Sequence, residues 1–533
     1  MTITKQQIYK IISRKHGLKV SSDAIQYLVE LFEDSDNSQL MENIDLIIKE
    51  YVLQEGGGKS IEKSPLELVV ETLFKKQNLN QFVDQETENL EGISQYFKVL
   101  DTFNLPQYSY RQDDKSFYLD KSDRSLLATA DKKSTLYRNR YDILKQRFLR
   151  NEAFRMSNFS ADKDSYFKTT PIIHLKGKPP GRYLLFGMLT QIEERLLHLE
   201  DLDACIQVDF ATNFQKGVGI FTRNCFVLAQ GEYTADGIFL IDIIGMPLPE
   251  RREDSLLALT NNVNLFGGPT MTDDHSFLLQ LEKSSDEVSF VLISDLWLDQ
   301  PQVFEKLRLL FEGYSEAIIP LAFIFIGNFQ STPFNYTSQE SSAYRESFDQ
   351  LANLISEFPE IAAQSHFIFV PGPNDPWAGN IVPRPPIPVQ YRQKLNAKVK
   401  NVHFTGNPCR IKYCTQDIII FREDLMNTMR RNAIIPVTDD QDMPLERHMI
   451  ATILDQSYLT PVPIDVKPVY WAHSNALMVY PQPHLLVLAD RFETYEHMYE
   501  GCLAVNPGSF PNSDFQFLVY QPATNVCETS KIS

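Results

Sequence analysis

The sequence lacks the long apolar segments of a membrane or secreted protein. Its longest apolar run, from Ala317 to Gly327, contains a proline and falls well short of the roughly 20 residues that a membrane helix needs. The opening residues, MTITKQQIYK, are polar and lack the apolar core of a secretory signal. We therefore expect no membrane contact and a chain that stays in the cytosol or nucleus.

Cysteine is scarce, with six among 533 residues. In a reducing compartment these are expected to be thiols. Cys409 and Cys414 form one C-x4-C pair, CRIKYC, but no second pair follows at ligand spacing. Buried apolar cysteines are therefore favoured over a zinc site, and we predict no cofactor.

Positive charge is in deficit, because 51 lysines and arginines face 69 aspartates and glutamates, a formal net charge of -18. This excess repels a phosphate backbone, so DNA binding by the whole surface is not expected. The basic segment Lys132–Arg155 is a local exception, in which Tyr137, Tyr141, Leu144 and Phe148 recur at helical spacing. We interpret it as an amphipathic helix with a solvated basic face. DNA contact by that face is the alternative.

The length and a hydrophobic content of 43% predict several domains, each with its own core. Residues 1–76 repeat an apolar period of 3.6 residues in four segments, which predicts a small helical domain. Periodicity fades in the polar residues 77–134, which we interpret as a linker with short helices. The fold class is expected to be multidomain α+β.

Residues 135–285 begin with the basic helix and continue with short apolar segments such as CIQVDF and CFVLAQGEY, separated by turn residues. This density of strands predicts a small β-barrel, for which an OB-fold is the commonest five-stranded choice. Acidic residues along these strands favour a structural role over the binding of single strands: Glu193, Glu194, Glu200, Asp201, Asp203 and Asp209.

Residues 286–533 alternate apolar strands with helical segments, which predicts an α/β domain whose sheet is covered on both faces. In such sheets, functional side chains gather at the carboxyl ends of the strands. Three of these ends have the sequences SDLW, GNF and GPND.

The order and spacing of these ends resemble the calcineurin-like metallophosphoesterases, whose strand ends carry D-x-H, G-D and G-N-H-D/E. By position, Asp295 matches the first aspartate, and Trp297 stands where that family has a histidine. Asn328 replaces the aspartate that bridges two metals, and Asn374 replaces the next histidine, leaving Asp375. The resemblance implies a phosphoesterase fold with a degenerate metal site.

The last histidine motif of that family falls on ADRF, where Asp490 and Phe492 occupy the histidine positions. Indole and phenyl rings cannot ligate a metal, and a neutral amide lacks the charge that holds two cations together. We predict no catalytic residue and no metal ligand. The alternative is one weak all-oxygen site formed by Asp295, Asp375 and Asp490. Two later histidines are expected to be structural: His473 and His484.

An acidic OB-like barrel followed by a phosphoesterase-like domain with decayed ligands resembles the B subunits of the replicative DNA polymerases alpha, delta and epsilon. LISDLWLDQ, VPGPNDP, TGNPCRIKYCTQDIIIFREDL and VNPGSFP resemble the epsilon branch in particular. The resemblance covers nearly the whole chain and is most specific from Ser294 to Pro511. It also implies that residues 1–76 have the fold of the helical lid of AAA+ proteins.

The resemblance implies a nuclear, noncatalytic accessory subunit in DNA replication. Its expected partners are the C-terminal zinc-bearing region of the polymerase epsilon catalytic subunit, the small histone-fold subunits, and the replicative helicase through the N-terminal domain. Direct DNA contact would be weak. The competing hypothesis is an active metal-dependent phosphodiesterase or nuclease. Trp377, in a long proline-rich loop from Pro371 to Pro388, is a candidate partner anchor, or else packs onto its own domain.

Overall fold

A computed structural model describes most of the chain. Within residues 90–532 it omits 123, 155–166, 176, 195, 260–262, 269–274, 378 and 438–442. Of the first 89 residues it describes 12, 19–31, 47–48, 51, 60–61, 63, 65–66 and 70. The chain divides into two compact units, Met1–Asn89 and Leu90–Ser533, each of which is considered by itself.

The first unit contains helix α2 (Ser22–Leu31) and a parallel pairing of β1 (Lys19–Val20) with β2 (Ser60–Ile61). Apolar residues from all four predicted helical segments share one core: Ile12, Ala24, Leu28, Ile47, Ile48, Tyr51, Ile61, Leu66 and Val70. Most of the other three predicted helices, and with them the lid-like fold, lie outside the described residues.

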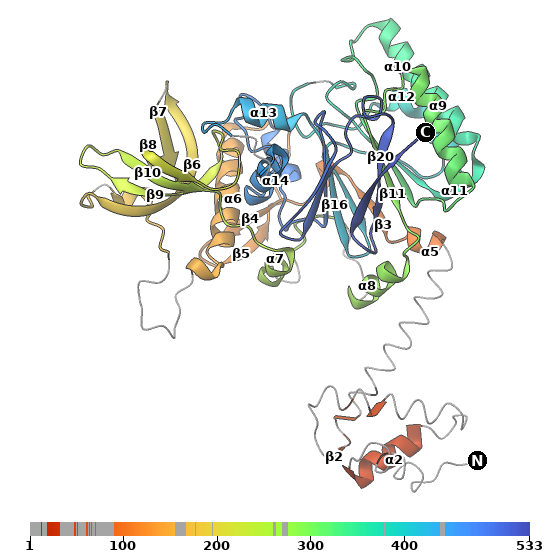
Figure 1. Cartoon of the computed structure of the whole chain (residues 1–533), viewed down its shortest axis with the longest axis horizontal. Coiled ribbons are helices and arrows are strands. Elements are labelled where there is room, and N and C mark those ends of the chain that lie inside the picture. Colours follow the sequence, from red (N-terminus) through yellow and green to blue (C-terminus); the bar gives the residue numbers. More distant parts are fainter. Residues whose placement is uncertain are drawn as a thin grey trace. The chain divides into compact units, whose positions relative to one another are not determined.

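The second unit contains the predicted barrel, which closes in the order β10-β8-β7-β6-β9. Its β8–β10 pairing is parallel and its other pairings are antiparallel. The barrel is drawn in yellow tones in Figure 1. Its strands are β6 (Gly181–Glu193), β7 (Leu196–Glu200), β8 (Cys205–Lys216), β9 (Phe226–Tyr233) and β10 (Phe239–Gly245).

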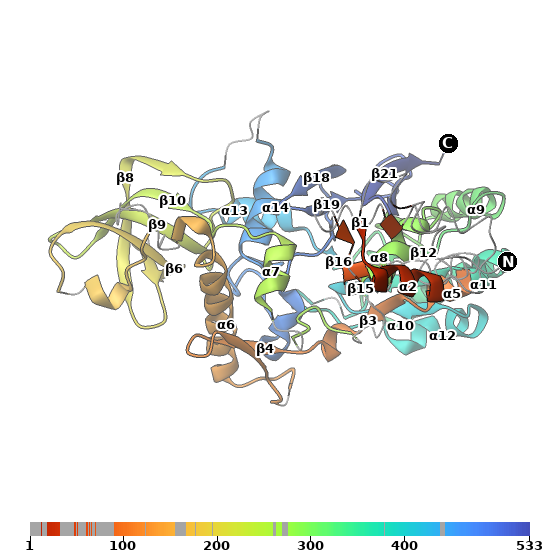
Figure 2. The ribbon, with the colours of Figure 1, turned by 90° about the horizontal axis from the view of Figure 1, so that it is seen from below.

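Helix α6 (Ala130–Phe148) lies between the barrel and the rest of this unit (Figures 1 and 2). Its Tyr141, Leu144 and Phe148 pack against barrel residues, which confirms the predicted apolar face. The described helix ends at Phe148, before the predicted end at Arg155, because residues beyond it turn into a short 3-10 helix, η2 (Glu152–Phe154).

The predicted solvated basic face of α6 is wrong for Arg140 and Arg147, each only 2% exposed. Arg147 donates hydrogen bonds to Pro247 O, Leu454 O, Asp455 O and Ser457 Oγ. Arg140 donates to Asn224 O and Gln456 Oε1 and lies over the rings of Phe226 and Tyr458. Because these partners come from both the barrel region and residues 454–458, the two arginines join the two regions.

Two six-stranded sheets form the rest of the unit, in the orders β14-β13-β12-β11-β20-β21 and β18-β19-β17-β16-β15-β3. The first contains β11 (Phe290–Ser294), β12 (Ala322–Ile326), β13 (His366–Val370), β14 (Val402–Phe404), β20 (Gln516–Gln521) and β21 (Val526–Lys531). The second contains β3 (Phe97–Leu100), β15 (Cys409–Tyr413), β16 (Gln416–Arg422), β17 (Leu485–Ala489), β18 (Tyr495–Tyr499) and β19 (Cys502–Asn506).

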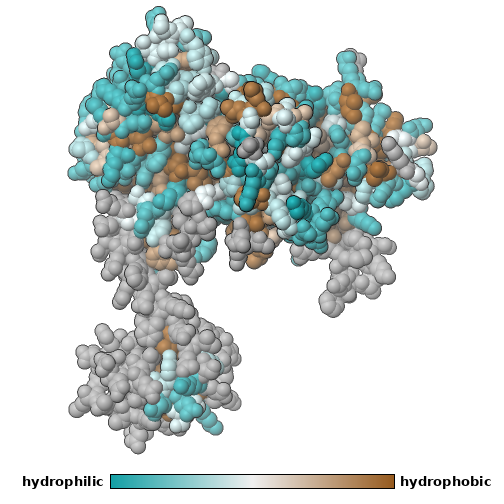
Figure 3. Space-filling model, turned by 180° about the vertical axis from the view of Figure 1, so that it is seen from behind, coloured by the Kyte–Doolittle hydropathy of each residue, from teal (hydrophilic) through white to brown (hydrophobic). Residues whose placement is uncertain are grey.

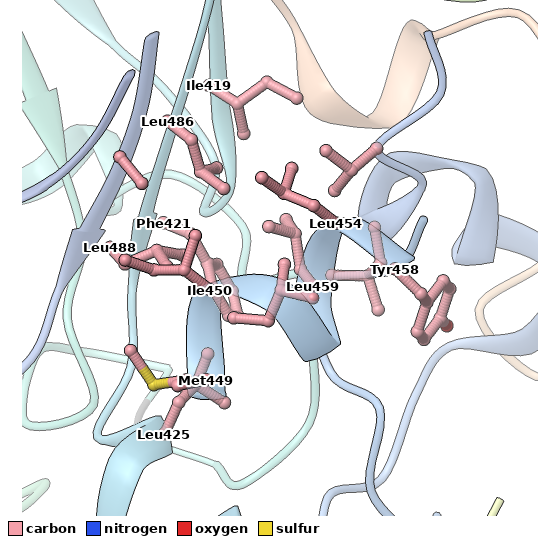
Figure 4. Packing of buried hydrophobic residues seen from close by; sticks show 14 of the residues in the cluster. Ile419, Phe421, Leu425, Met449, Ile450, Leu454, Tyr458, Leu459, Leu486 and Leu488 are labelled. Atoms are coloured by element: carbon pink, nitrogen blue, oxygen red, sulfur yellow. The ribbon is translucent and has the colours of Figure 1, made fainter. Parts of the chain in front are cut away.

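Each sheet packs helices on one face and the other sheet on its opposite face. The first packs against α9 (Pro301–Ser315), α10 (Ser338–Ser356), α11 (Pro359–Gln364) and α12 (Val389–Lys398). The second packs against α13 (Leu425–Arg431), α14 (Leu445–Asp455) and η4 (Trp471–Leu477), with Ile450 and Leu454 facing Ile419 and Leu486 in Figure 4.

The predicted single sheet with helices on both faces is therefore corrected to two facing sheets. The ring of Phe290 in β11 lies 5.5 Å from the rings of Phe97 and Tyr413 in the second sheet. Apolar strands look alike whether a helix or a second sheet covers them, because both remove the strand from water.

The predicted linker, residues 77–134, is corrected from Leu90 onward. Strand β3 pairs with β15 at the edge of the second sheet. Strands β4 (Tyr108–Arg111) and β5 (Ser116–Leu119) form a hairpin, and α5 (Leu90–Ser94) precedes them. An edge strand and a small hairpin bury few side chains, so their residues can be polar and need not alternate regularly with apolar ones. The sequence pattern therefore did not indicate these strands.

Two further helices, α7 (Arg252–Ala258) and α8 (His275–Ser284), lie between the barrel and β11 in the sequence. Across the described part of the chain, no helix has the length and apolarity to cross a membrane. The face of the second unit seen in Figure 3 mixes hydrophilic residues with small apolar patches.

Candidate functional site

The three predicted strand ends meet in space, because β11, β12 and β13 are adjacent and parallel. Asp295 follows β11, Asn328 follows β12, and Asn374 and Asp375 follow β13. Asn328 donates to Asp295 Oδ1 from its backbone N at 3.1 Å and from its side-chain Nδ2 at 3.0 Å. Its Oδ1 accepts from Asn374 N at 2.7 Å. The amide thus links all three strand ends.

Two glycines allow this close approach. A Cβ at Gly327 would lie 2.2 Å from Asp375 Oδ2, and one at Gly372 would lie 2.5 Å from Asn328 Oδ1. Both distances are well inside van der Waals contact, so only glycine fits at either position. Asp295 itself has a φ of 55°, a conformation that few non-glycine residues adopt.

Asp375 is fully buried and satisfied by neighbouring donors. It accepts from Phe329 N at 2.8 Å, Gly372 N at 2.7 Å and Tyr344 Oη at 3.2 Å. Burial raises the pKa of its carboxyl to about 6, although these hydrogen bonds and the charge of Arg422 oppose that rise. Its oxygens therefore stabilise the loop.

Arg422 at the end of β16 is the central cation of the site and is fully buried. Its Nη2 lies 2.9 Å from Asp295 Oδ1, and its Nη1 lies 2.8 Å from Asp424 Oδ1. Its Nε donates to Gly327 O at 2.8 Å, and Nη1 also donates to Ala489 O at 3.3 Å. Burial alone would lower the pKa of Arg422, but Asp295 and Asp424 raise it above its ordinary value.

Asp490 and Phe492 lie at the end of β17. Asp490 accepts from Met426 N at 2.8 Å and from Phe492 N at 3.2 Å, and burial raises the pKa of its carboxyl. Phe492 packs against the apolar core between the second sheet and helices α13 and α14. Among the described residues, no three His, Cys, Asp or Glu side chains are grouped so that they could hold a metal ion. The alternative three-aspartate set is therefore not assembled.

The two tryptophans of interest lie in different environments. Trp297 is half-buried, and its indole N–H is buried without a hydrogen-bond partner among the described residues. Trp377 is 55% exposed, and its backbone N–H donates to Tyr336 Oη at 2.7 Å. The side chain of Trp377 therefore projects largely into solvent.

Of the two histidines predicted to be structural, His473 is buried and His484 is partly buried. His473 lies with its ring 5.0 Å from that of Phe103, and His484 Nδ1 accepts from Asp417 N at 3.0 Å. Burial lowers the pKa of His484 to about 4, so the ring is neutral at pH 7. Cys409 and Cys414 are buried, as predicted for apolar cysteines.

Sequence reasoning missed Arg422 and Asp424, although a signal was present. The segment QDIIIFRED is an apolar strand that ends in three charged residues, and charged side chains at the carboxyl end of a buried strand point to a site. A search restricted to metal-ligand motifs overlooks Arg422, which pairs with the carboxylates of Asp295 and Asp424.

Comparisons with known proteins cover nearly the whole chain. The family described as the B subunit of DNA polymerase alpha/epsilon matches residues 290–497, and the OB-fold domain of DNA polymerase epsilon subunit 2-like proteins matches residues 130–248. Proteins named DNA polymerase epsilon subunit 2 from Bos taurus and Homo sapiens are each 38% identical over 527 residues, 97% of this chain and 96% of theirs.

A protein named DNA polymerase epsilon subunit 2 from Drosophila melanogaster is 32% identical over 524 residues, 97% of this chain and 95% of its own. A solved structure described as a novel archaeal phosphodiesterase matches 46% of this chain and 99% of that one at 8% identity, with a TM-score of 0.24. That likeness is too distant to bear on function.

Proposed function

The chain belongs to the family of DNA polymerase epsilon B subunits, accessory subunits in DNA replication, and from that premise we propose that it is a noncatalytic scaffold. Its OB-fold domain and its phosphoesterase-like domain together hold the C-terminal zinc-bearing region of the polymerase's catalytic subunit. The first unit links the complex to the replicative helicase, the small histone-fold subunits complete it, and it acts in the nucleus.

The observation that carries the proposal is the guanidinium of Arg422 between Asp295 and Asp424. A two-metal phosphoesterase needs two divalent cations about 3.5–4 Å apart to generate its hydroxide. Here one fixed monovalent cation is bound to the carboxylate that matches the first metal ligand. A guanidinium cannot ionise a water as a metal does, so the arrangement supports a degenerate calcineurin-like site without hydrolysis.

The neutral amides support the same proposal. Asn328 directs its N–H groups at Asp295, whereas a bridging aspartate would direct oxygens at metals. Such a donor repels a cation and binds a carboxylate, so the pair holds the strand ends together as a structural element.

The joined barrel and sheets support the scaffold role. Arg140 and Arg147 hold the barrel against residues 454–458 through hydrogen bonds from Arg140 Nη2 and from both Nη atoms of Arg147. A partner that contacts both regions therefore meets a preorganised surface, which lowers the entropic cost of binding. Trp377, largely exposed on the loop beyond β13, is proposed as an apolar anchor for that partner.

The test of the catalytic half is manganese calorimetry together with an assay on bis-(p-nitrophenyl) phosphate. We expect neither stoichiometric binding nor turnover. Stoichiometric binding with turnover abolished by Asp295→Ala would establish the alternative, a metal-dependent phosphodiesterase or nuclease.

The test of the scaffold half is a pull-down with the C-terminal region of the polymerase epsilon catalytic subunit. We expect capture by the full chain and about tenfold weaker capture by Trp377→Ala, with unchanged unfolding because the side chain is mostly exposed. Leu257→Ala, at a residue 85% exposed on α7, is the control. Normal capture by Trp377→Ala would contradict the proposed anchor role of Trp377. Failure of the full chain to capture the catalytic subunit's region would contradict the proposed scaffold function.

A further inference from the structure

A groove on the barrel differs in charge from the chain as a whole. It has a volume of about 330 Å³, and its described lining contains three basic side chains, Lys168, Lys178 and Arg182, and no acidic one. Phe167 and Tyr183 also line it. The groove lies at the start of β6, beside β9, and not on the acidic strands β7 and β8.

The groove is held open by backbone and side-chain contacts. Thr170 N donates to Leu184 O at 2.8 Å, which fixes the segment before β6 on the barrel. The ring of Tyr183 is oriented by its Oη, which donates to Pro179 O at 3.0 Å. The Lys178 ammonium lies 5.1 Å from the centre of that ring. These contacts place a cation and an aromatic face side by side.

The lysines supply the positive charge of the groove. Arg182 is paired with Asp242 at 2.7 Å, so it offers donors without adding net charge. Lys168 and Lys178 are exposed, and neither forms an ion pair within the described part of the chain. Among the described residues of the groove, these two lysines reverse the sign of the local charge in a protein whose net charge is -18.

We propose that this groove binds single-stranded nucleic acid. Phe167 is 54% exposed and gives a flat apolar face on which bases can stack, next to the Tyr183 ring that lies under Lys178. Lys168 and Lys178 lie where they can neutralise the phosphates that connect those bases. An acidic peptide would satisfy the lysines but would leave the exposed Phe167 ring without a matching planar group. On α6, Arg140 and Arg147 donate to internal acceptors, so the basic side chains of that helix do not combine with exposed aromatic rings as they do in this groove.

The experiment measures fluorescence anisotropy of a labelled oligothymidylate with the full chain over a range of salt concentrations. Lys168→Gln/Lys178→Gln should weaken binding and reduce the slope of log affinity against log salt by about 1.4, because each phosphate contact on a single strand contributes about 0.7. Lys283→Gln/Lys400→Gln, a matched pair of exposed lysines outside the groove, should leave the slope unchanged.

Phe167→Ala should weaken binding of the oligothymidylate by roughly tenfold while leaving both the salt slope and the binding of an abasic strand unchanged. Absence of binding by the wild-type chain, or equal slopes for the groove and control pairs, would overturn the proposal. Displacement of the strand by polyglutamate as readily as by an unlabelled oligothymidylate would instead identify an acidic peptide as the ligand.

Discussion

The chain buries arginines in two regions, and they are compensated in different ways. At the junction of barrel and sheets, Arg147 bonds carbonyl oxygens and a hydroxyl, and burial lowers its pKa. At the strand ends, Arg422 bonds two carboxylates, which raise its pKa despite burial. Neutral acceptors orient a guanidinium, whereas carboxylates also balance its charge. The junction therefore joins two regions through hydrogen bonds, and the strand ends are held by a charge-balanced buried ion pair.

The largest effect should come from Arg422→Gln. It leaves Asp295 buried with no opposing charge, and breaking a buried ion pair in this way costs about 3–5 kcal/mol of unfolding free energy. Urea denaturation measures it. The control is Arg308→Gln at the exposed pair with Glu357, which should change little. Equal losses of unfolding free energy in the two variants would show that the buried pair stabilises the fold no more than the exposed pair does.

A smaller loss is expected from Arg147→Met, which keeps volume but removes the donors at the junction. The carbonyls of Leu454 and Pro247 would lose those hydrogen bonds, which should cost about 2–3 kcal/mol. The same denaturation experiment measures this loss. An unchanged unfolding free energy would mean that the junction does not depend on this residue, and the proposed preorganised surface would lose its basis.

Per pH unit, the smallest effect is the titration of Asp455 at the same junction. Burial raises the pKa of Asp455 to about 7, against the opposing influences of Arg147 and a hydrogen bond from Tyr499. Its ordinary value is about 3.9, so the folded state holds an extra proton between about pH 4 and 7. The stability from this group is complete below pH 4 and is lost as pH rises to about 7, at no more than about 1.4 kcal/mol per pH unit.

Asp455→Asn removes this titration. The unfolding free energy of the variant relative to the wild type should therefore increase steadily from pH 4.5 to pH 7.5. Parallel curves for the two proteins across that range would contradict the raised pKa.

Much of the fold was predictable from local patterns. Short strands separated by turn residues indicated the barrel, and SDLW, GNF and GPND identified three strand ends that meet because parallel neighbours share an edge. Which strands share a sheet was not predictable, since β3 joins β15 across more than 300 residues of sequence, and such pairing leaves no local periodicity.

The meeting of the three strand ends was predictable, and the arginine among them was not. Asp295, Asn328 and Asp375 lie at these strand ends, but the cation that pairs with Asp295 is Arg422, which comes from the other sheet. The prediction of a solvated basic face on α6 was wrong for a related reason. An arginine on a helix can point into solvent or can donate to buried carbonyls, and which of these occurs depends on the residues packed against the helix.

The most direct test of the charge-balanced pair at the strand ends is a double-mutant cycle of Asp295→Asn and Arg422→Gln by urea denaturation. If the two side chains stabilise each other as a buried ion pair, the double variant should be less destabilised than the sum of the single variants by about 2 kcal/mol or more. Additive losses of unfolding free energy, with a coupling energy near zero, would contradict the buried ion pair. The alternative, a metal site at Asp295, would then have to be considered again.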